Sequence, residues 1–214
     1  MIRRALRWTL AAIVFLWMGR RLALPRFWVF GAITFAAVFY ISTRADPTLI
    51  RERVRPAGPT VDPSSLLAIR FFAIATLSAT ISDIAVFHSS DTVPGPVRVA
   101  AMGAYALSLA LTARAMVVNR FFSTAIRIQS DRHQAIVTTG PYLVIRHPGY
   151  LGLAIALPSL ALALGSWFGL PFAVGYSALI IRRAAVEDQY LQEHLEGYRD
   201  YASRVRYRLI PGLW

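Results

Sequence analysis

Long apolar runs, broken only by short polar stretches, constrain what this chain can fold into. Residues 22–41, 66–87 and 97–118 each have about the 20 residues that a helix needs to cross a bilayer. Two shorter runs, 149–164 and 168–181, are separated only by Gly165-Ser166-Trp167, a linker that permits nothing but a helical hairpin. With 56% hydrophobic residues, the chain has a membrane-protein profile. These features predict an all-α, polytopic transmembrane helical bundle that forms one integrated membrane domain.

The first apolar run, 5–19, leaves the number of spans at five or six. It is short and follows Arg3, Arg4 and Arg7, as the core of a signal peptide does. No convincing small-residue cleavage site follows it. We therefore expect either a tight hairpin with residues 22–41, or one interfacial helix followed by one span.

The distribution of arginine predicts the orientation. The loops 43–65 and 119–146 and the tail after Arg182 are basic, whereas 89–96 has no basic residue, so the three basic segments are expected in the cytoplasm. The net charge of +12 favours anionic lipid headgroups as partners, and no motif for binding nucleic acid is present. We expect a multi-pass protein of the inner cell membrane, if prokaryotic, or of the endoplasmic reticulum, if eukaryotic. The lack of cysteine excludes disulfides and thiolate chemistry.

The stretch 138–153, TTGPYLVIRHPGYLGL, combines a turn, two basic side chains and a helix start. Pro148 cannot continue a helix from His147 but suits the first position of a new one, which places His147 at the N-cap. The side chains of Arg146 and His147, with the amides of residues 149–151, would suit a carboxylate or phosphate. An equally weighted alternative is a juxtamembrane loop whose arginine reaches the headgroups.

The tail predicts a helix with one mostly apolar face. Asp188, by contrast, falls on another face with other polar residues and is expected to be solvated. Arg183 and Glu187 lie on the apolar stripe one turn apart, where they could point inward or form only a surface ion pair. Since the last hairpin brings Pro148 near Ile181, this pair would meet the 146–150 stretch. The stripe consists of Arg183, Glu187, Leu191, Leu195, Tyr198, Ala202 and Val205.

These motifs together resemble the isoprenylcysteine carboxyl methyltransferase and phospholipid methyltransferase group of integral membrane enzymes. The matching residues are Thr139-Gly140-Pro141-Tyr142, Arg146-His147-Pro148-Gly149-Tyr150-Leu151-Gly152, Arg183 with Glu187-Asp188, Gly197-Tyr198 with Tyr201, and Arg208-Leu209-Ile210-Pro211-Gly212. The resemblance covers 119–214, which would be the catalytic and cofactor-binding half, whereas 1–118 would supply substrate-side transmembrane helices. A cytoplasmic C-terminal helix would close the cofactor pocket.

The resemblance implies methyl transfer from S-adenosyl-L-methionine to a lipophilic acceptor from the bilayer, without a metal. The acceptor would be a lipid or an isoprenoid or prenylcysteine-type carboxylate, with carboxyl O-methylation favoured over N-methylation. Arg183 would hold an acceptor carboxylate, and Glu187 would act as base for an amine. The implied cofactor-binding residues are Ile136, Val137, Gly140, Tyr142, Arg146, His147, Pro148, Tyr150, Leu151, Glu187, Asp188, Tyr198 and Tyr201.

Within that set, the resemblance assigns parts of the cofactor to different residues. The methionine carboxylate would lie near His147, the amino group or ribose near Glu187, and the adenine against apolar side chains such as Ile136. The family usually has paired glutamates where this chain has Glu187-Asp188, so Asp188 is the weaker match. Accordingly, Asp188→Ala is expected to be milder than Glu187→Ala.

Two other functions remain open from the sequence. One is an NADPH-dependent membrane reductase of the steroid or sterol type, whose carboxyl-terminal half has a similar arrangement. The other is a non-catalytic membrane scaffold that binds a lipid or a partner chain. Thermal stabilisation by S-adenosylmethionine, by NADPH or by neither would separate the three hypotheses, because a ligand of the native state raises its stability.

Overall fold

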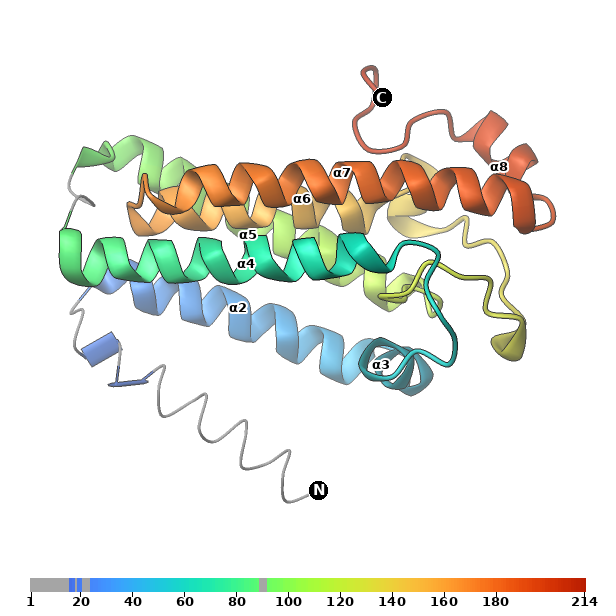
Figure 1. Cartoon of the computed structure of the whole chain (residues 1–214), viewed down its shortest axis with the longest axis horizontal. Helices are drawn as coiled ribbons and strands as arrows, with labels where there is room; N and C mark the ends of the chain where they lie inside the picture. Colours follow the sequence, from blue (N-terminus) through green and yellow to red (C-terminus); the bar gives the residue numbers. More distant parts are fainter. Residues whose placement is uncertain (1–15, 18, 21–23, 89–91) are drawn as a thin grey trace.

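Five long helices build the part of the chain that the structure, a computed structural model, describes: residues 16, 17, 19, 20, 24–88 and 92–214. They run roughly along one axis, and no strand occurs among the described residues (Figure 1). The all-α prediction is therefore confirmed, while most of the expected run 5–19 lies outside the described residues. The long helices are α2 (Pro25–Arg44), α4 (Pro63–Ser82), α5 (Gly95–Val118), α6 (Pro148–Leu164) and α7 (Gly169–His194).

Proline and aspartate define several helix starts. Pro25, Pro63 and Pro148 are each the first residue of a helix, where the missing N–H costs nothing and the fixed φ is already helical. Asp62 caps α4 by accepting a hydrogen bond from the Ser65 amide at 3.2 Å. His147 is the N-cap residue of α6, as the sequence predicted.

The loop predicted for residues 43–65 contains a short helix, α3 (Pro47–Val54), which the sequence analysis missed. Its start repeats the Asp-Pro signature of α4. Asp46 accepts hydrogen bonds from the Thr48 amide at 2.7 Å and from the Thr48 hydroxyl at 2.6 Å. The many arginines and prolines of this segment obscured that local signal.

Helix α6 lies between α5 and α7; α4 packs on α7, and α2 packs on α5. A glycine allows the closest approach of α5 and α6. A Cβ atom at Gly152 would lie 2.1 Å from Thr112 Oγ1 and 2.5 Å from the Ser108 carbonyl oxygen. The main chains of α5 and α6 therefore touch at this level, and no other residue type fits there without separating them.

The segments that join the helices gather at the two ends of the bundle. Helix α3, the connection 119–147 and the short helix α8 (Tyr198–Arg204) lie at one end, whereas π-helical η1 (Asp83–Phe87) and the α6–α7 turn lie at the other (Figure 1). The three segments predicted from arginine counts to share one side of a membrane thus do share one end of the bundle. We call this end the basic end.

Three helical segments in the described residues are long and apolar enough to cross a membrane. They are 25–44, 63–87 and 95–118, and they match three of the predicted runs. Helix α6 is apolar but, with 17 residues, shorter than these. The chain therefore has the helices of an integral membrane protein, and the predicted total of five to six spans stays a prediction.

The predicted stripe of the tail is broken. Helix α7 continues the last apolar run without interruption but ends at His194, and Gly197, with φ of 76°, turns the chain into α8. A left-handed backbone conformation of this kind favours glycine. Residues 183–205 therefore do not share a single helix face.

We predict that Gly152→Ala destabilises the protein, by roughly 1–3 kcal/mol, because the new methyl group forces α5 and α6 apart. Gly103→Ala in α5 is the matched control, since a Cβ there meets nothing within 4 Å. The control should raise stability by about 0.5–1 kcal/mol. Thermal unfolding of both variants in detergent micelles tests this, and equal midpoints would contradict the close approach.

Candidate functional site

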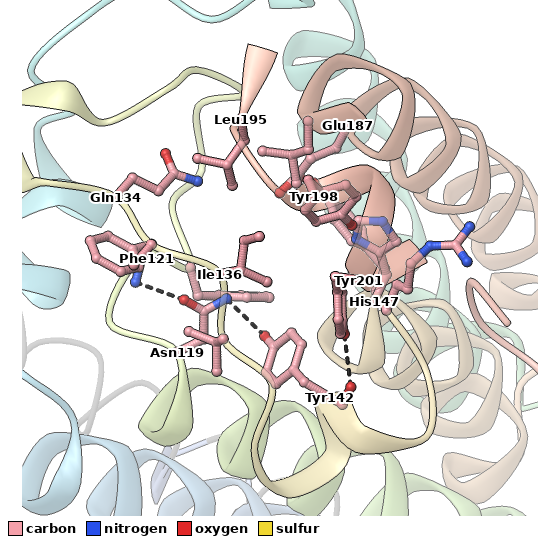
Figure 2. A pocket seen from close by; sticks show the side chains of 16 residues that line it. Asn119, Phe121, Gln134, Ile136, Tyr142, His147, Glu187, Leu195, Tyr198 and Tyr201 are labelled. Carbon is pink, nitrogen blue, oxygen red and sulfur yellow. Dashed lines mark hydrogen bonds between the residues drawn. The ribbon is translucent and has the colours of Figure 1, made fainter. Parts of the chain in front are cut away.

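A cavity at the basic end of the bundle brings together the connection 119–147, α7 and α8 (Figure 2). Aromatic and aliphatic side chains form most of its wall, and the polar groups are few. Its lining residues are Asn119, Phe121, Phe122, Gln134, Ala135, Ile136, Val137, Tyr142, Arg146, His147, Tyr150, Glu187, Leu191, Leu195, Tyr198 and Tyr201.

Asn119, immediately after α5, fixes one side of the cavity. Its Nδ2 donates to the Tyr142 hydroxyl at 3.2 Å, and its Oδ1 accepts from the Phe121 amide at 2.9 Å (Figure 2). The connection is thereby tied to the end of a membrane helix. Asn119 was not among the predicted site residues, although a polar residue directly after a long apolar run can indicate a functional position.

Gln134 faces Asn119 from the same connection and was also missed. Its Oε1 accepts a hydrogen bond from the Gln129 amide at 2.7 Å, which orients the side-chain amide. The remaining atom, Nε2, is a donor that Figure 2 shows on the side facing the other lining residues. The cavity thus contains a neutral donor that can bind a ligand oxygen.

Two buried tyrosines hold the connection against α8. Tyr201 donates its hydroxyl to the Tyr142 carbonyl oxygen at 2.7 Å. Burial raises the pKa of Tyr201 to about 12 and the pKa of Tyr142 further still. Both phenols are therefore neutral at physiological pH and act as hydrogen-bonding groups rather than as anions.

The carboxylate of Asp188 joins the segments around the cavity. It is 0% exposed, and Arg146 binds it in a bidentate manner, with Nε–Oδ1 at 2.7 Å and Nη2–Oδ2 at 3.0 Å. Bidentate pairs of this kind are among the strongest hydrogen-bonded contacts in proteins. The other groups bonded to Asp188 are His147 Nε2 at 3.1 Å, Tyr198 hydroxyl at 3.2 Å, Gln192 Nε2 at 2.8 Å and Arg208 Nε at 2.8 Å.

This arrangement corrects the sequence-based placement of Asp188 on a solvated face. Burial raises its pKa, but the hydrogen bonds from His147 and Arg146 lower it more, so the pKa ends far below the usual range. Asp188 is therefore an ionised, buried carboxylate. The sequence did not reveal this because the helix phase of α7 alone could not show that Arg208 and the tail fold back over that face.

Arg146 and His147 do form an anion site, as predicted, but Asp188 of the same chain occupies it. Arg146 also donates to the carbonyl oxygens of Val205 and Arg206 at 2.7 and 2.8 Å. The main-chain amides of Arg146 and His147 bind the Tyr207 and Arg208 carbonyl oxygens. The Arg146-His147 motif thus holds the tail in place. The Leu151 amide, which was expected to contribute to the anion site, is bonded to the His147 carbonyl oxygen within the helix.

Glu187, next to Asp188, points instead to the cavity. Its Oε2 accepts a hydrogen bond from the Tyr150 hydroxyl at 2.5 Å. Arg183 lies outside the cavity wall, is only 3% exposed, and donates to Ser65 Oγ at 2.8 Å and to the Thr124 carbonyl oxygen at 2.6 Å. The i,i+4 ion pair that the sequence left open does not occur between Arg183 and Glu187.

Most residues implied by the resemblance line the cavity. Asp188, Arg183, Gly140, Pro148 and Leu151 do not. Gly140, with φ of 59°, forms the turn before the 3₁₀-helix η4 (Gly140–Leu143), and Leu151 packs against the hydrophobic cluster around Tyr150. The implied residues that the cavity does contain are Ile136, Val137, Tyr142, Arg146, His147, Tyr150, Glu187, Tyr198 and Tyr201.

The chemistry of the lining suits a ligand with an apolar planar part and a few polar groups, because aromatic and aliphatic walls surround one carboxylate, one guanidinium, one imidazole and two side-chain amides. The cavity volume is about 50 Å³. A nucleoside-sized ligand therefore enters only when side chains from the connection or from the 191–195 segment move outward.

Comparison with known proteins gives matches in this same part of the chain. The phospholipid methyltransferase family matches residues 97–197, from α5 to the turn before α8. A protein-S-isoprenylcysteine O-methyltransferase B of Arabidopsis thaliana is 31% identical over 88 residues, which are 40% of this chain and 45% of that protein. A Delta(14)-sterol reductase of Mus musculus is 33% identical over 79 residues, which are 36% of this chain and 19% of that protein.

The matched segments span less than half the length of either relative. The family match nevertheless covers nearly all of α5, the connection with the Arg146-His147-Pro148 motif, α6 and the whole of α7. These are the segments that build most of the cavity and supply its carboxylate. The resemblance inferred from the sequence is thereby confirmed: this part of the chain is similar both to the phospholipid methyltransferase family and to an isoprenylcysteine methyltransferase.

Proposed function

We propose that this protein is an integral membrane methyltransferase that uses S-adenosyl-L-methionine to methylate a lipophilic acceptor taken from the bilayer. The observation that carries the proposal is the position of Glu187 and His147 in one cavity with aromatic and aliphatic walls, built mostly from the segment that matches the methyltransferase family. A polar cavity at the end of apolar helices suits a water-soluble cofactor and a lipid-soluble acceptor.

The cofactor has groups that the lining can bind. Its adenine would lie against Ile136, Val137 and Tyr142, its ribose or amino group would bind Glu187, and its carboxylate would bind near His147. Gln134 adds a donor on the opposite wall. When bound, S-adenosylmethionine supplies a methyl group on a sulfonium centre, which passes to the acceptor in a single in-line displacement.

For such a displacement the chain contributes mainly orientation and the exclusion of water. A carboxylate acceptor is already ionised at neutral pH and needs no base, whereas an amine acceptor would need one, for which Glu187 is placed. We favour carboxyl O-methylation, in line with the name of the Arabidopsis relative. The acceptor would be a lipid or an isoprenoid or prenylcysteine-type acid.

We further propose that the basic end lies in the cytoplasm. Its connecting segments carry most of the loop arginines, which are enriched on the cytoplasmic side of membrane proteins and attract anionic lipid headgroups. A cofactor made in the cytoplasm would then reach the cavity directly, and the acceptor would reach it from the bilayer.

A second candidate function is a nicotinamide-dependent reductase, because a Delta(14)-sterol reductase matches this chain at a similar level of identity. The same cavity could hold a nicotinamide nucleotide against its aromatic wall. The two hypotheses differ in the cofactor and can be separated by binding alone.

We predict that S-adenosylmethionine binds the detergent-purified protein and that NADPH does not. Parallel calorimetric titrations measure both affinities, and thermal unfolding with each ligand gives a second readout, since a ligand at 100 times its Kd stabilises by about 2.7 kcal/mol. Binding of NADPH alone would replace the methyltransferase proposal with the reductase one. Binding of neither would support the scaffold hypothesis.

Glu187→Gln should weaken S-adenosylmethionine binding about tenfold or more, because a hydrogen bond to a charged group contributes about 1.5–3 kcal/mol. Glu193→Gln is the matched control: Glu193 lies on the same helix but is exposed and outside the cavity. Isothermal titration of the two variants checks this. An affinity of Glu187→Gln equal to that of the control would remove Glu187 from the proposed site.

Asp188→Ala should act on stability rather than directly on the cofactor. Removing this carboxylate leaves the guanidinium of Arg146 buried without its counter-charge, which costs roughly 3–5 kcal/mol. Glu187→Ala, at the cavity wall, should cost much less stability, whereas the order expected from the sequence for cofactor binding stays a prediction. Unfolding midpoints of both variants in the same detergent test this, and a milder effect of Asp188→Ala would contradict the structural role of Asp188.

A further inference from the structure

Arg53, on α3, turns inward at the basic end of the bundle. Its Nη1 donates to the Phe122 carbonyl oxygen at 3.1 Å, and its guanidinium carbon lies 5.1 Å from the centre of the Phe122 ring. Burial lowers the pKa of Arg53, whereas the phenols of Tyr150 and Tyr176 raise it. A residue from the segment expected to be a polar loop thus reaches the wall of the cavity.

No carboxylate pairs with Arg53 among the described residues. The preceding residue, Glu52, is bonded instead to Arg127 at 3.0 Å. Arg53 is therefore a partly buried cation whose hydrogen-bond partner is a neutral carbonyl group. Most of its donors remain able to bind a further acceptor.

Arg183, on α7, also contacts the connection after α5 and, like Arg53, is bonded only to neutral groups. Its partners are the Asp62 carbonyl oxygen at 3.3 Å, Ser65 Oγ and the Thr124 carbonyl oxygen, all neutral. Among the described residues it too lacks an ion pair. The neighbouring Arg182, by contrast, is paired with the Asp62 carboxylate at 2.7 Å.

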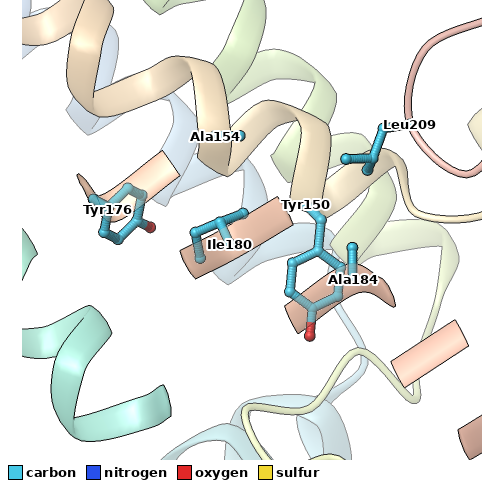
Figure 3. Close-up of a cluster of buried hydrophobic side chains, with 6 residues drawn as sticks. All are labelled: Tyr150, Ala154, Tyr176, Ile180, Ala184 and Leu209. Atoms are coloured by element: carbon cyan, nitrogen blue, oxygen red, sulfur yellow. The ribbon is translucent and has the colours of Figure 1, made fainter. Parts of the chain in front are cut away.

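Tyr150 connects these two arginines with the cavity. The ring of Phe122, which Arg53 contacts, lies 6.5 Å from the Tyr150 ring, and the Tyr150 phenol donates to Glu187. Figure 3 shows Tyr150 and Tyr176 on adjacent helices, α6 and α7, within one buried cluster. Both guanidinium groups thus bind the main chain of the connection after α5, Arg53 at Phe122 and Arg183 at Thr124.

A cation that is buried, or partly buried, without a carboxylate partner loses hydration, and an anionic ligand offsets that cost. We propose that Arg53, together with Arg183, binds the anionic head group, a carboxylate or a phosphate, of the lipid in the acceptor site. This inference rests on the proposed function and adds Arg53, from the amino-terminal half, as a residue that determines acceptor specificity. Arginine suits both anions because its fork binds two oxygens at once.

The surroundings also suit the rest of such a lipid. Partly buried Ile69 and Phe72 of α4 pack on the cluster that contains Tyr150 and Tyr176. Helix α4 packs on α6 and α7, whereas α2 packs on α5 and α6. The two helices thus cover different parts of the bundle. The apolar tail would extend from Arg53 along α4, and its head would stay beside Glu187.

Direct binding of matched lipids to the detergent-purified protein tests the proposal. The probes are oleate, which carries a carboxylate, lysophosphatidate, which carries a phosphate, and uncharged oleyl alcohol of the same chain length. We expect at least one acidic probe to bind ten times or more tightly than oleyl alcohol, and the stronger of the two identifies the head group. Arg53→Gln should abolish this preference, and Arg53→Lys should retain part of it.

Arg55→Gln is the matched control, since Arg55 directly follows the same helix and is exposed, whereas Arg53 contacts Phe122 of the cavity wall. It should leave the preference unchanged. Equal binding of charged and uncharged probes to the wild type, an unchanged preference in Arg53→Gln, or an equal loss in Arg55→Gln would each overturn the proposal.

Titration with S-adenosylmethionine separates this inference from the proposed function. Unchanged cofactor affinity in Arg53→Gln shows that the variant is folded and that its effect is confined to the acceptor side. If the wild type prefers acidic lipids but binds no S-adenosylmethionine, the anion site stands and the methyltransferase proposal fails. If the wild type binds the cofactor without preferring acidic lipids, the methyltransferase proposal stands and the anion site fails.

Discussion

The buried carboxylate of Asp188 is the interaction on which the basic end of the molecule depends. It joins the helix-start motif of α6, the middle of α7, the first residue of α8 and the tail through bonds to Arg146, His147, Tyr198 and Arg208. A charged group at 0% exposure is tolerated here because every oxygen is bonded to positively charged or strongly polar donors.

One stretch of α7 therefore carries three separate tasks. Glu187 points to the cavity, Asp188 points to the tail, and Arg183, one turn earlier, is held by α4 and by the connection after α5. Residues three or four positions apart share a helix face, but adjacent residues do not, so neighbouring carboxylates can serve unrelated purposes. The pair Glu187-Asp188 thus combines a carboxylate at the cavity wall with a structural anchor.

The position of the cavity follows from the way the bundle packs. Close contact of α5 and α6 at Gly152 brings the end of α5, with Asn119, beside the start of α6, with His147. The connection between these helices must then loop out at the basic end and return, and it supplies most of one wall. The helices thus define an apolar body, and the polar groups gather where α5 and α7 end.

The sequence by itself determined the helical class, the starts of the long helices to within a few residues, the helix start at Pro148 and the family resemblance, because apolar runs and proline act locally. Only the tertiary structure decided which charges are buried. Asp188 was expected in solvent, Asn119 and Gln134 were missed, and α3 with Arg53 was taken for loop. Each of these depends on contacts between segments far apart in the chain, such as Asp188 with Arg146 and Arg53 with Phe122. Helical periodicity cannot specify such contacts.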